Sequence, residues 1–349
     1  MNYNTKLETT LKASFHLQAQ RITAIRMFTT AAIKTRSVDF KQLSLAMNPE
    51  VDDDSNIKRL QRLVDEVKLE AADKRHFVLM GRLKVRVSLD RTEWDFGSVT
   101  NNLLTAGVET NGLAVPVHTK DLGKCGSSND DERIEAVDAI LEIIPVECIE
   151  VLTADREFLS IRFLAHLLAK GILFSARLKS DAVIEHGGER KSAAEWFQAY
   201  QRKSLRSAVV YGSIANICGR RLKKRNGKQD YLIVVTNLEP KVGFELYRTR
   251  WKIETLFGAL KSRGFNLEET RVTQSHRLEN LVLLLAIAIL WALRVGLFVS
   301  SLGRDRVRAD GTRFYSLFRV GLDFLRRLFL NPKLDLVVWD KVIQVLSCT

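Results

Sequence analysis

The spacing of apolar residues changes along the chain, from a helical period near the amino terminus to a period of two further on. Apolar residues recur at helical spacing from Phe15 to Met27. Shorter helices are predicted over Asp39 to Met47 and over Asn56 to Val67, with Ser37 or Asp39 as the cap of the first. Residues 1–80 are therefore expected to be helical.

From about residue 82, polar and apolar residues alternate as they do in half-buried strands. Lys84 to Leu89 is the first such strand, and we expect it to end in Asp90. Two further strands are predicted at Leu103 to Val108 and Leu113 to His118, separated by Asn111-Gly112. Short links between three consecutive strands favour an antiparallel meander.

Helices and apolar strands alternate after the meander. In chain order the predicted elements are a helix over Glu132 to Ile144 capped by Asn129 or Asp130, a strand over Ile149 to Ala154 that ends in Asp155, a helix over Phe158 to Leu168, a strand over Ile172 to Ala176, a long insertion, a strand over Tyr231 to Thr236, and a helix over Val242 to Ser262. This order predicts an α/β fold, with helices on the faces of a mixed sheet. It is the outline of an RNase H-like core that carries an insertion.

One uncharged apolar run, Leu281 to Leu293, resembles a membrane span. A span needs about 20 residues, so this shorter run is expected to be a buried core helix. Beyond about residue 305 the pattern predicts a helix over Phe314 to Leu328 and a strand over Leu334 to Trp339. The first residues lack the pattern of a secretory signal, and the four cysteines have no paired spacing, so a reduced, cytoplasmic location is expected.

Positive charge dominates the chain. Its 349 residues include 54 Lys and Arg against 41 Asp and Glu, a net charge of +13, which predicts a polyanionic partner. Nucleic acid is the first candidate and an anionic membrane surface the second. The predicted helix over Asn56 to Val67 carries Lys58, Arg59 and Arg62, which suits either a helix in a DNA groove or an ordinary solvent face.

Most of the excess charge lies in residues 179–228, which hold twelve Lys or Arg and four Asp or Glu, a net charge of +8. Asn226-Gly227 is a strong hairpin-turn signal within it. The densest basic residues are Arg220, Arg221, Lys223, Lys224 and Arg225. We interpret the segment as a basic β-ribbon that follows phosphates, the alternative being a solvated loop that aids solubility.

The helix near residue 250 carries a polar stripe. At about 100° per residue, Tyr247, Arg250, Glu254 and Lys261 fall within an arc of about 60° on one helix face. Taken alone, Arg250 and Glu254 would be an ordinary surface pair. Asp90 and Asp155 change this interpretation, because both are expected at the ends of neighbouring strands. Three carboxylates so placed can hold two divalent cations, and Arg250 and Lys261 could bind the adjacent phosphates.

These residues also resemble a known family. Tyr247-x-x-Arg250-x-x-x-Glu254, followed after six residues by Lys261, resembles the YREK signature of insertion-sequence-4 family transposases. LDRTEW at Leu89 to Trp94 and TADREF at Thr153 to Phe158 resemble the first two acidic motifs of that family's DDE triad. The motifs of zinc peptidases, P-loop NTPases, α/β-hydrolases and dinucleotide-binding folds do not occur.

The resemblance implies a catalytic role. Asp90, Asp155 and Glu254 would be the catalytic residues and the ligands of two Mg²⁺ ions, with Mn²⁺ able to substitute. A bacterial enzyme of this kind binds terminal inverted repeats, dimerises across the paired ends and transfers cleaved 3′ ends to target DNA.

The resemblance also implies a division of the chain. Residues 1–80 would be a helical domain that binds DNA ends, 81–178 and 229–305 the RNase H-like core, 179–228 a mainly β insertion, and 306–349 a helical segment that is a candidate for dimerisation. Three other functions remain open: a nuclease that cuts without joining, a non-catalytic DNA-binding regulator derived from a transposase, and a membrane-associated basic protein.

Overall fold

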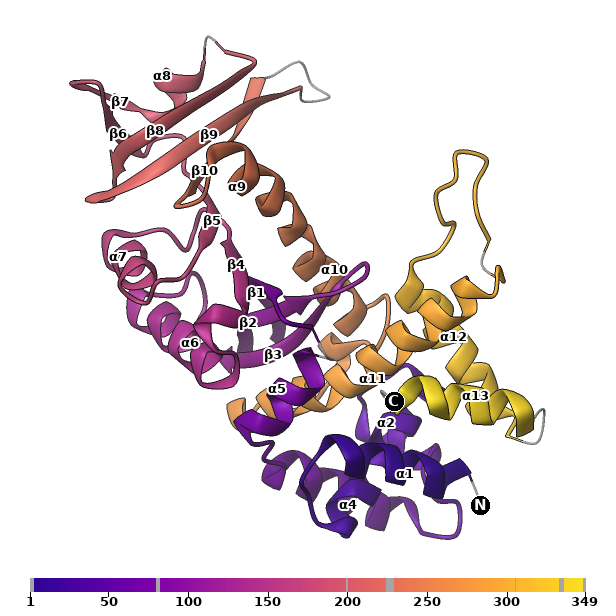
Figure 1. The fold of residues 1–349 in the computed structure, drawn as a ribbon. Helices are drawn as coiled ribbons and strands as arrows, with labels where there is room; N and C mark the ends of the chain where they lie inside the picture. Colours follow the sequence, from indigo (N-terminus) through magenta and orange to yellow (C-terminus); the bar gives the residue numbers. More distant parts are fainter. Residues whose placement is uncertain are drawn as a thin grey trace.

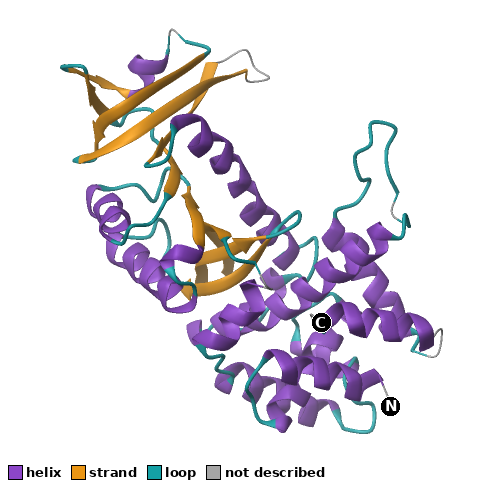
Figure 2. Cartoon of the chain, in the orientation of Figure 1, coloured by secondary structure: helices purple, strands orange, loops and turns teal. Residues whose placement is uncertain are grey.

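A sheet of ten strands runs through the molecule in the order β3-β2-β1-β4-β5-β10-β9-β8-β6-β7, and a helical body lies at one end of it (Figure 1). The computed structural model describes residues 3–79, 82–198, 200–223, 229–304, 306–332 and 336–347. Figure 2 shows that strands and helices are segregated, with the strand-rich half distant from both termini.

The first five strands form the core. They are β1 (Val85–Phe96), β2 (Val99–Glu109), β3 (Ala114–Asp121), β4 (Ile149–Ala154) and β5 (Phe174–Arg177). β1, β2 and β3 pair antiparallel, as predicted, whereas β4 lies parallel to β1 and β5 parallel to β4. This order, with a leading meander followed by parallel strands, is the RNase H-like topology, and the predicted fold class is confirmed.

Helices α6 (Asp130–Ile143) and α7 (Ile161–Ala169) cover one face of the core sheet. Asn129 caps α6 with a full capping box, in which its side chain accepts from the Glu132 amide and Glu132 returns a bond to the Asn129 amide. Ser160 caps α7 in a similar way, by accepting from the Phe163 amide. The helix that was expected from Phe158 therefore begins three residues later.

The remaining strands extend the same sheet. They are β6 (Val183–His186), β7 (Glu189–Ser192), β8 (Arg202–Val210), β9 (Ser213–Lys223) and β10 (Gln229–Thr236), with the short helix α8 (Ala193–Phe197) between β7 and β8. β9 and β10 pair antiparallel, from Lys223 opposite Gln229 to Asn216 opposite Thr236. The predicted Asn226-Gly227 turn lies outside the described residues. The insertion is mainly β, as expected.

The helical body is built from both ends of the chain. It contains α1 (Tyr3–Ser14), α2 (Ala19–Thr35), α3 (Phe40–Leu45), α4 (Asp53–Glu66), α5 (Ala71–Leu79), α11 (Ser275–Ser301), α12 (Leu317–Leu330) and α13 (Leu336–Leu346). The helix expected over Phe15 to Met27 is interrupted, because α1 ends at Ser14 and α2 begins at Ala19. Phe15 is instead buried between the helices.

Helix α11 is the centre of this body. It is long and apolar enough to cross a membrane, yet 78% of its most apolar window is buried inside the protein, as in the core helix of a soluble protein. The prediction of a buried core helix over Leu281 to Leu293 is thus confirmed. Where α11 meets α12, a Cβ atom on Gly321 would lie 1.7 Å from the Ala292 carbonyl oxygen and one on Gly296 would lie 2.0 Å from that of Leu317. The two backbones touch at this crossing.

The strand predicted over Leu334 to Trp339 is wrong. The described part of this segment is helix α13, and residues 333–335 lie outside the described residues. Trp339, Val342 and Leu346 are buried and are spaced three and four residues apart, which is the period of a helix. Trp339 stacks on Tyr3 of α1 with ring centroids 4.6 Å apart, so packing against the amino-terminal helices selects the helix.

Candidate active site

Two of the three predicted acids lie side by side on the core sheet. The last parallel pair between β1 and β4 joins Leu89 to Ala154, and Asp90 and Asp155 are the next residues of the two strands. Asp90 was expected to end its strand, but β1 continues to Phe96, because Asp90 and the residues after it keep pairing with β2. It is the pairing with β4 that ends just before Asp90, at Leu89.

The third acid is on a helix that crosses this position. The single helix predicted over Val242 to Ser262 consists of α9 (Pro240–Tyr247), a 3-10 turn (Arg248–Arg250) and α10 (Trp251–Leu260). Glu239 and Pro240 begin α9, with the Glu239 carboxylate accepting from two backbone amides. Ile253, Leu256 and Leu260 are buried, and α10 packs on β1, β2 and β3. With this face fixed on the sheet, Glu254 lies at its flank, on the side where Arg250 contacts both Glu254 and Asp90.

Arg250 joins two of the carboxylates. Its Nη1 donates to Asp90 Oδ2 at 2.6 Å, and its Nη2 donates to Glu254 Oε1 at 2.6 Å. Tyr247 donates its hydroxyl to Asp155 Oδ1 at 3.2 Å. The structure therefore brings together all three acids and two of the basic or phenolic residues singled out in the sequence.

Lys261 lies further along the same helix face and contacts the first acidic motif instead. Its Nζ forms an ion pair with Glu268 at 2.7 Å, lies 3.4 Å from the Glu93 carbonyl oxygen and sits 5.3 Å from the centre of the Trp94 ring. None of these contacts reaches the three acids.

Burial controls the electrostatics of the site. The Asp90 side chain is 14% exposed, and burial raises its pKa to about 6, with the charges of Asp155 and Glu157 adding to the rise and Arg250 opposing it. Burial also raises the pKa of Tyr247 to about 12, so its phenol stays protonated. For Arg250, burial acts against the charge, but the neighbouring Tyr247 and the carboxylates outweigh it and raise the pKa.

The donor set suits a hard divalent cation. Carboxylate oxygens are the ligands such cations prefer, and Asp90, Asp155 and Glu254 present three carboxylates around Arg250 and Tyr247. Within the described ranges, no three His, Cys, Asp or Glu side chains are arranged to hold a metal ion as they stand. Arg250 bonds both Asp90 and Glu254, so a metal bound by both requires the guanidinium to release at least one of them.

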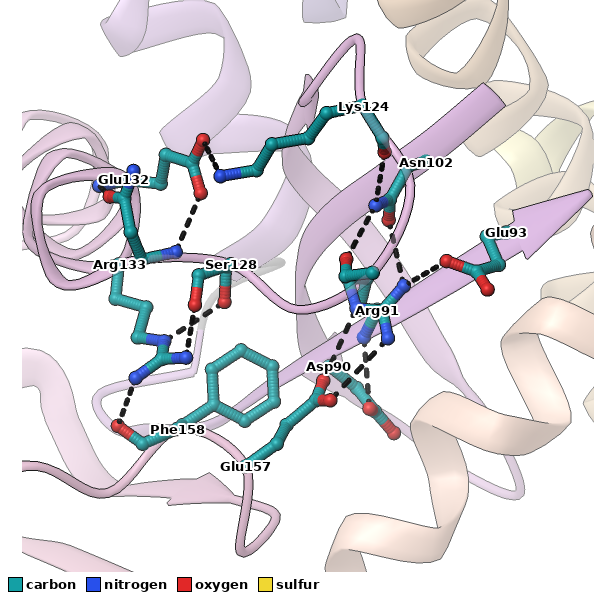
Figure 3. A network of polar contacts seen from close by, with 12 residues as sticks. Asp90, Arg91, Glu93, Asn102, Lys124, Ser128, Glu132, Arg133, Glu157 and Phe158 are labelled. Carbon is teal, nitrogen blue, oxygen red and sulfur yellow. Dashed lines mark hydrogen bonds and ion pairs between the residues drawn. The ribbon is translucent and has the colours of Figure 1, made fainter. Parts of the chain in front are cut away.

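A second ion-pair network joins the two acidic motifs (Figure 3). Arg91, next to Asp90, lies with its Nε 3.4 Å from Glu157 Oε1, two residues after Asp155. The same guanidinium donates to Glu93 and to Asn102 on β2. Arg133 of α6 donates to the Phe158 carbonyl at 3.3 Å and so holds the far end of the second motif. Arg91 of the first motif and Glu157 of the second thus hold together the two segments that carry Asp90 and Asp155.

Sequence reasoning missed Glu109, at the end of β2. Its side chain is 1% exposed, and its Oε1 accepts from Ser88 at 2.9 Å and from Thr249 at 2.9 Å. Its Oε2 has no hydrogen-bond partner in the described part of the chain, although Lys252 Nζ lies 3.6 Å away. Glu109 therefore ties β1, two residues before Asp90, to the turn that carries Arg250. The only signal in the sequence was a carboxylate at the end of an apolar strand.

Among the described residues of the insertion, no basic side chain forms a hydrogen bond or ion pair with the three acids. Arg220 is exposed and Arg221 half-buried on β9, at the end of the β9–β10 pair away from α9. Lys223 ends β9, and its side chain lies outside the described residues, as do Lys224 and Arg225. Their predicted role in phosphate binding stays a prediction.

Comparison with known proteins identifies the family. A family model described as a transposase DDE domain matches residues 92–291, which is more than half of the chain. The chain belongs to the DDE transposase family. The match includes Asp155 and Glu254 and begins two residues after Asp90. Enzymes of this family cut DNA and transfer its strands, and they use divalent metal ions.

Two other comparisons add detail. No curated protein matches the chain. Among solved structures, the piggyBac transposase synaptic complex with hairpin DNA aligns with 94% of this DDE transposase and 76% of that chain, at a TM-score of 0.43 and 11% sequence identity.

Proposed function

We propose that this DDE transposase is a bacterial enzyme of the insertion-sequence-4 family, which binds the terminal inverted repeats of its element, cleaves there and transfers the 3′ hydroxyl ends into target DNA. The observation that carries the proposal is the contact set of the YREK residues. Arg250 binds Asp90 and Glu254, while Tyr247 binds Asp155. Residues closely spaced between α9 and α10 thus meet acids from two strands that are distant in sequence and adjacent in the sheet.

Asp90, Asp155 and Glu254 would hold two Mg²⁺ ions, with Mn²⁺ able to substitute, and bound ions would polarise the attacking and leaving oxygens of a phosphodiester. When the metal ions are absent, Arg250 would neutralise the charges of Asp90 and Glu254. On release from a carboxylate, its guanidinium can bind a phosphate oxygen of the DNA strand. Tyr247, kept protonated by burial, can hold the Asp155 carboxylate in one orientation.

The rest of the chain would position the DNA. Arg21, Arg59 and Arg62 line a groove of about 480 Å³ between α2 and α4, which supports end recognition by residues 1–80. The insertion, residues 179–228, would follow the phosphates with its basic side chains. We propose that residues 306–349 contribute to a homodimer in the DNA-end complex, and that the enzyme acts in the bacterial cytoplasm, associated with the nucleoid when bound.

The test is substitution of each acid in the full-length protein. Asp90→Asn, Asp155→Asn and Glu254→Gln should each reduce Mg²⁺-dependent cleavage of DNA from the flanks of the gene by at least about 10³-fold. Binding of the same DNA should stay within a few-fold of wild type. Glu245→Gln is the matched control, because Glu245 is an exposed acid on α9 that pairs with Arg248.

Three results would contradict the proposal. Normal cleavage by any one of the acid variants would remove that residue from the site. Cleavage by the wild type without joining of a pre-cut end would make the chain a nuclease. Tight DNA binding with no Mg²⁺-dependent turnover would make it a regulator.

A further inference from the structure

The connection between α11 and α12 forms a narrow two-stranded projection, the 306–315 ribbon. Figure 1 shows this connection extending well clear of both helices. Val307 and Arg313 form an antiparallel bridge, and the Phe314 amide donates to the Arg306 carbonyl at 2.8 Å. Gly311, with φ of 81°, reverses the chain at the tip. The projection is a hydrogen-bonded ribbon and contributes nothing to the buried core.

Two arginines of the ribbon are held in place by an aromatic ring. The Cζ atoms of Arg306 and Arg308 lie 5.0 Å and 5.4 Å from the centre of the Phe314 ring. Tyr315 packs edge-on against the same ring at 4.9 Å. Phe314 is 46% exposed and Tyr315 48% exposed. Stacking on a ring face reduces the freedom of a guanidinium while leaving its N–H groups available for hydrogen bonds.

The charge of the ribbon favours a polyanion over a protein partner. Among the residues that the structure describes, no carboxylate forms an ion pair with Arg306 or Arg308, whereas Arg91, Arg133 and Arg250 of the core each have one. Asp310, the one acid between residues 306 and 315, accepts hydrogen bonds from Thr312. A two-stranded ribbon also has the width that the major groove of duplex DNA admits, about 12 Å.

We propose that the 306–315 ribbon is a duplex-DNA contact of this enzyme. In this contact, Arg306 and Arg308 bind backbone phosphates, and the Phe314 ring positions their two guanidinium groups. The inference rests on the proposed function in one respect: the DNA is taken to be an element end or the target. Backbone contacts carry no sequence information, so the ribbon should bind both sources alike.

The experiment compares two double variants of the full-length protein. Arg306→Ala/Arg308→Ala removes the two stacked cations. Arg162→Ala/Lys170→Ala removes the same charge from α7 and the residue that follows it, where Arg162 pairs with Asp131 and Lys170 with Asp138 on the surface. Dissociation constants are measured by fluorescence anisotropy, from about 50 to about 200 mM salt, on an element-end duplex and on an unrelated duplex.

For the ribbon variant we expect affinity to fall about tenfold at low salt and the slope of log K against log salt to decrease in magnitude by about 1.8, on both duplexes. The control variant should keep the wild-type slope. Phe314→Leu keeps both arginines but removes the ring, and should weaken binding about threefold. Circular dichroism checks that all variants are folded.

Unchanged slopes in the ribbon variant would overturn the inference. So would a change in oligomeric state, measured by light scattering, without a change in DNA affinity, because the ribbon would then contact a second copy of the chain. If the wild type cleaves element ends while the ribbon variant binds DNA normally, only the ribbon inference fails. If the wild type does not bind DNA, the proposed function fails with it.

Discussion

The core strands β1–β5 and the extension β6–β9 belong to one sheet, but they differ in how far their ion pairs are exposed to solvent. In the core, Asp90 and Arg250 are 14% and 11% exposed and bond each other directly. In the extension, Arg190 and Glu185 form an ion pair while 72% and 52% exposed. Buried charges are weakly screened and interact strongly, whereas exposed charges are screened by water and salt. A few core residues should therefore decide catalysis, while many extension residues should share DNA binding.

The largest effect in this contrast is expected at Arg250. Arg250→Gln removes the hydrogen bonds to Asp90 and Glu254 and leaves two partly buried carboxylates without their cation. Cleavage at saturating DNA should fall about 100-fold, which corresponds to about 3 kcal/mol. Arg248→Gln, two residues away on the surface, should cleave nearly as the wild type does. Equal cleavage rates for both variants would remove the distinction between core and surface.

Glu109 tests whether a buried acid outside the cluster supports it. Glu109→Ala leaves the hydroxyls of Ser88 and Thr249 without their shared acceptor, so we expect a loss of about 2 kcal/mol in the free energy of unfolding. Glu109→Gln keeps an acceptor oxygen and should lose less. Urea denaturation measures both. If the alanine variant is as stable as the glutamine variant, the hydrogen bonds to Glu109 do not stabilise the core.

His118 on β3 gives the core a pH dependence of stability. Burial, followed by the charge of Lys74, lowers the pKa of His118 to about 4 from 6.5. As pH falls below 6.5, His118 becomes protonated in the unfolded chain, whereas in the folded chain it stays neutral until about pH 4. The free energy of unfolding therefore decreases on acidification between these two values.

Between pH 7 and pH 5 this should cost about 2 kcal/mol. His118→Gln should remove that part of the pH dependence, which denaturation at both pH values would detect. A variant that loses as much stability as the wild type over this interval would contradict the assignment.

The smallest effect is expected in the extension. Replacing Arg220, Arg221 and Lys223 by Ala should weaken DNA binding about tenfold at low salt, and the difference should shrink as salt rises. The cleavage rate at saturating DNA should stay unchanged, because none of the described side chains here contacts the acids. A loss of rate that excess DNA does not restore would show that the extension acts on the chemistry as well.

The parts of the fold that depend on local patterns could be predicted from the sequence. Alternation over Lys84 to Leu89 and the cap of α6, expected at Asn129 or Asp130, act within a few residues, so both were predictable. The position of Asp90 within β1 depends on pairing with β2, and α13 depends on packing against Tyr3. The pairing does not follow from a short window of sequence, and the helical spacing of Trp339, Val342 and Leu346 lies beyond the window, Leu334 to Trp339, from which a strand was predicted.

The candidate site divides in the same way. Tyr247, Arg250 and Glu254 are close in sequence, and their shared helix face could be calculated from the helical period alone. Glu109 reaches Thr249 across 140 residues, and no periodicity connects the two. Contacts of that kind arise only when β2 and the turn before α10 meet in the folded chain.

The glycines at the α11–α12 crossing link the ribbon to the catalytic core mechanically. With no side chains between the backbones at Gly296 and Gly321, there is no compressible layer to absorb a displacement. Helix α11 also packs on β3, so a load on the ribbon would pass through the crossing into the edge of the core sheet. A Cβ atom at Gly321 or Gly296 would lie 1.7 Å or 2.0 Å from a backbone oxygen of the other helix, so the two helices would have to separate and the ribbon that joins them would shift with them.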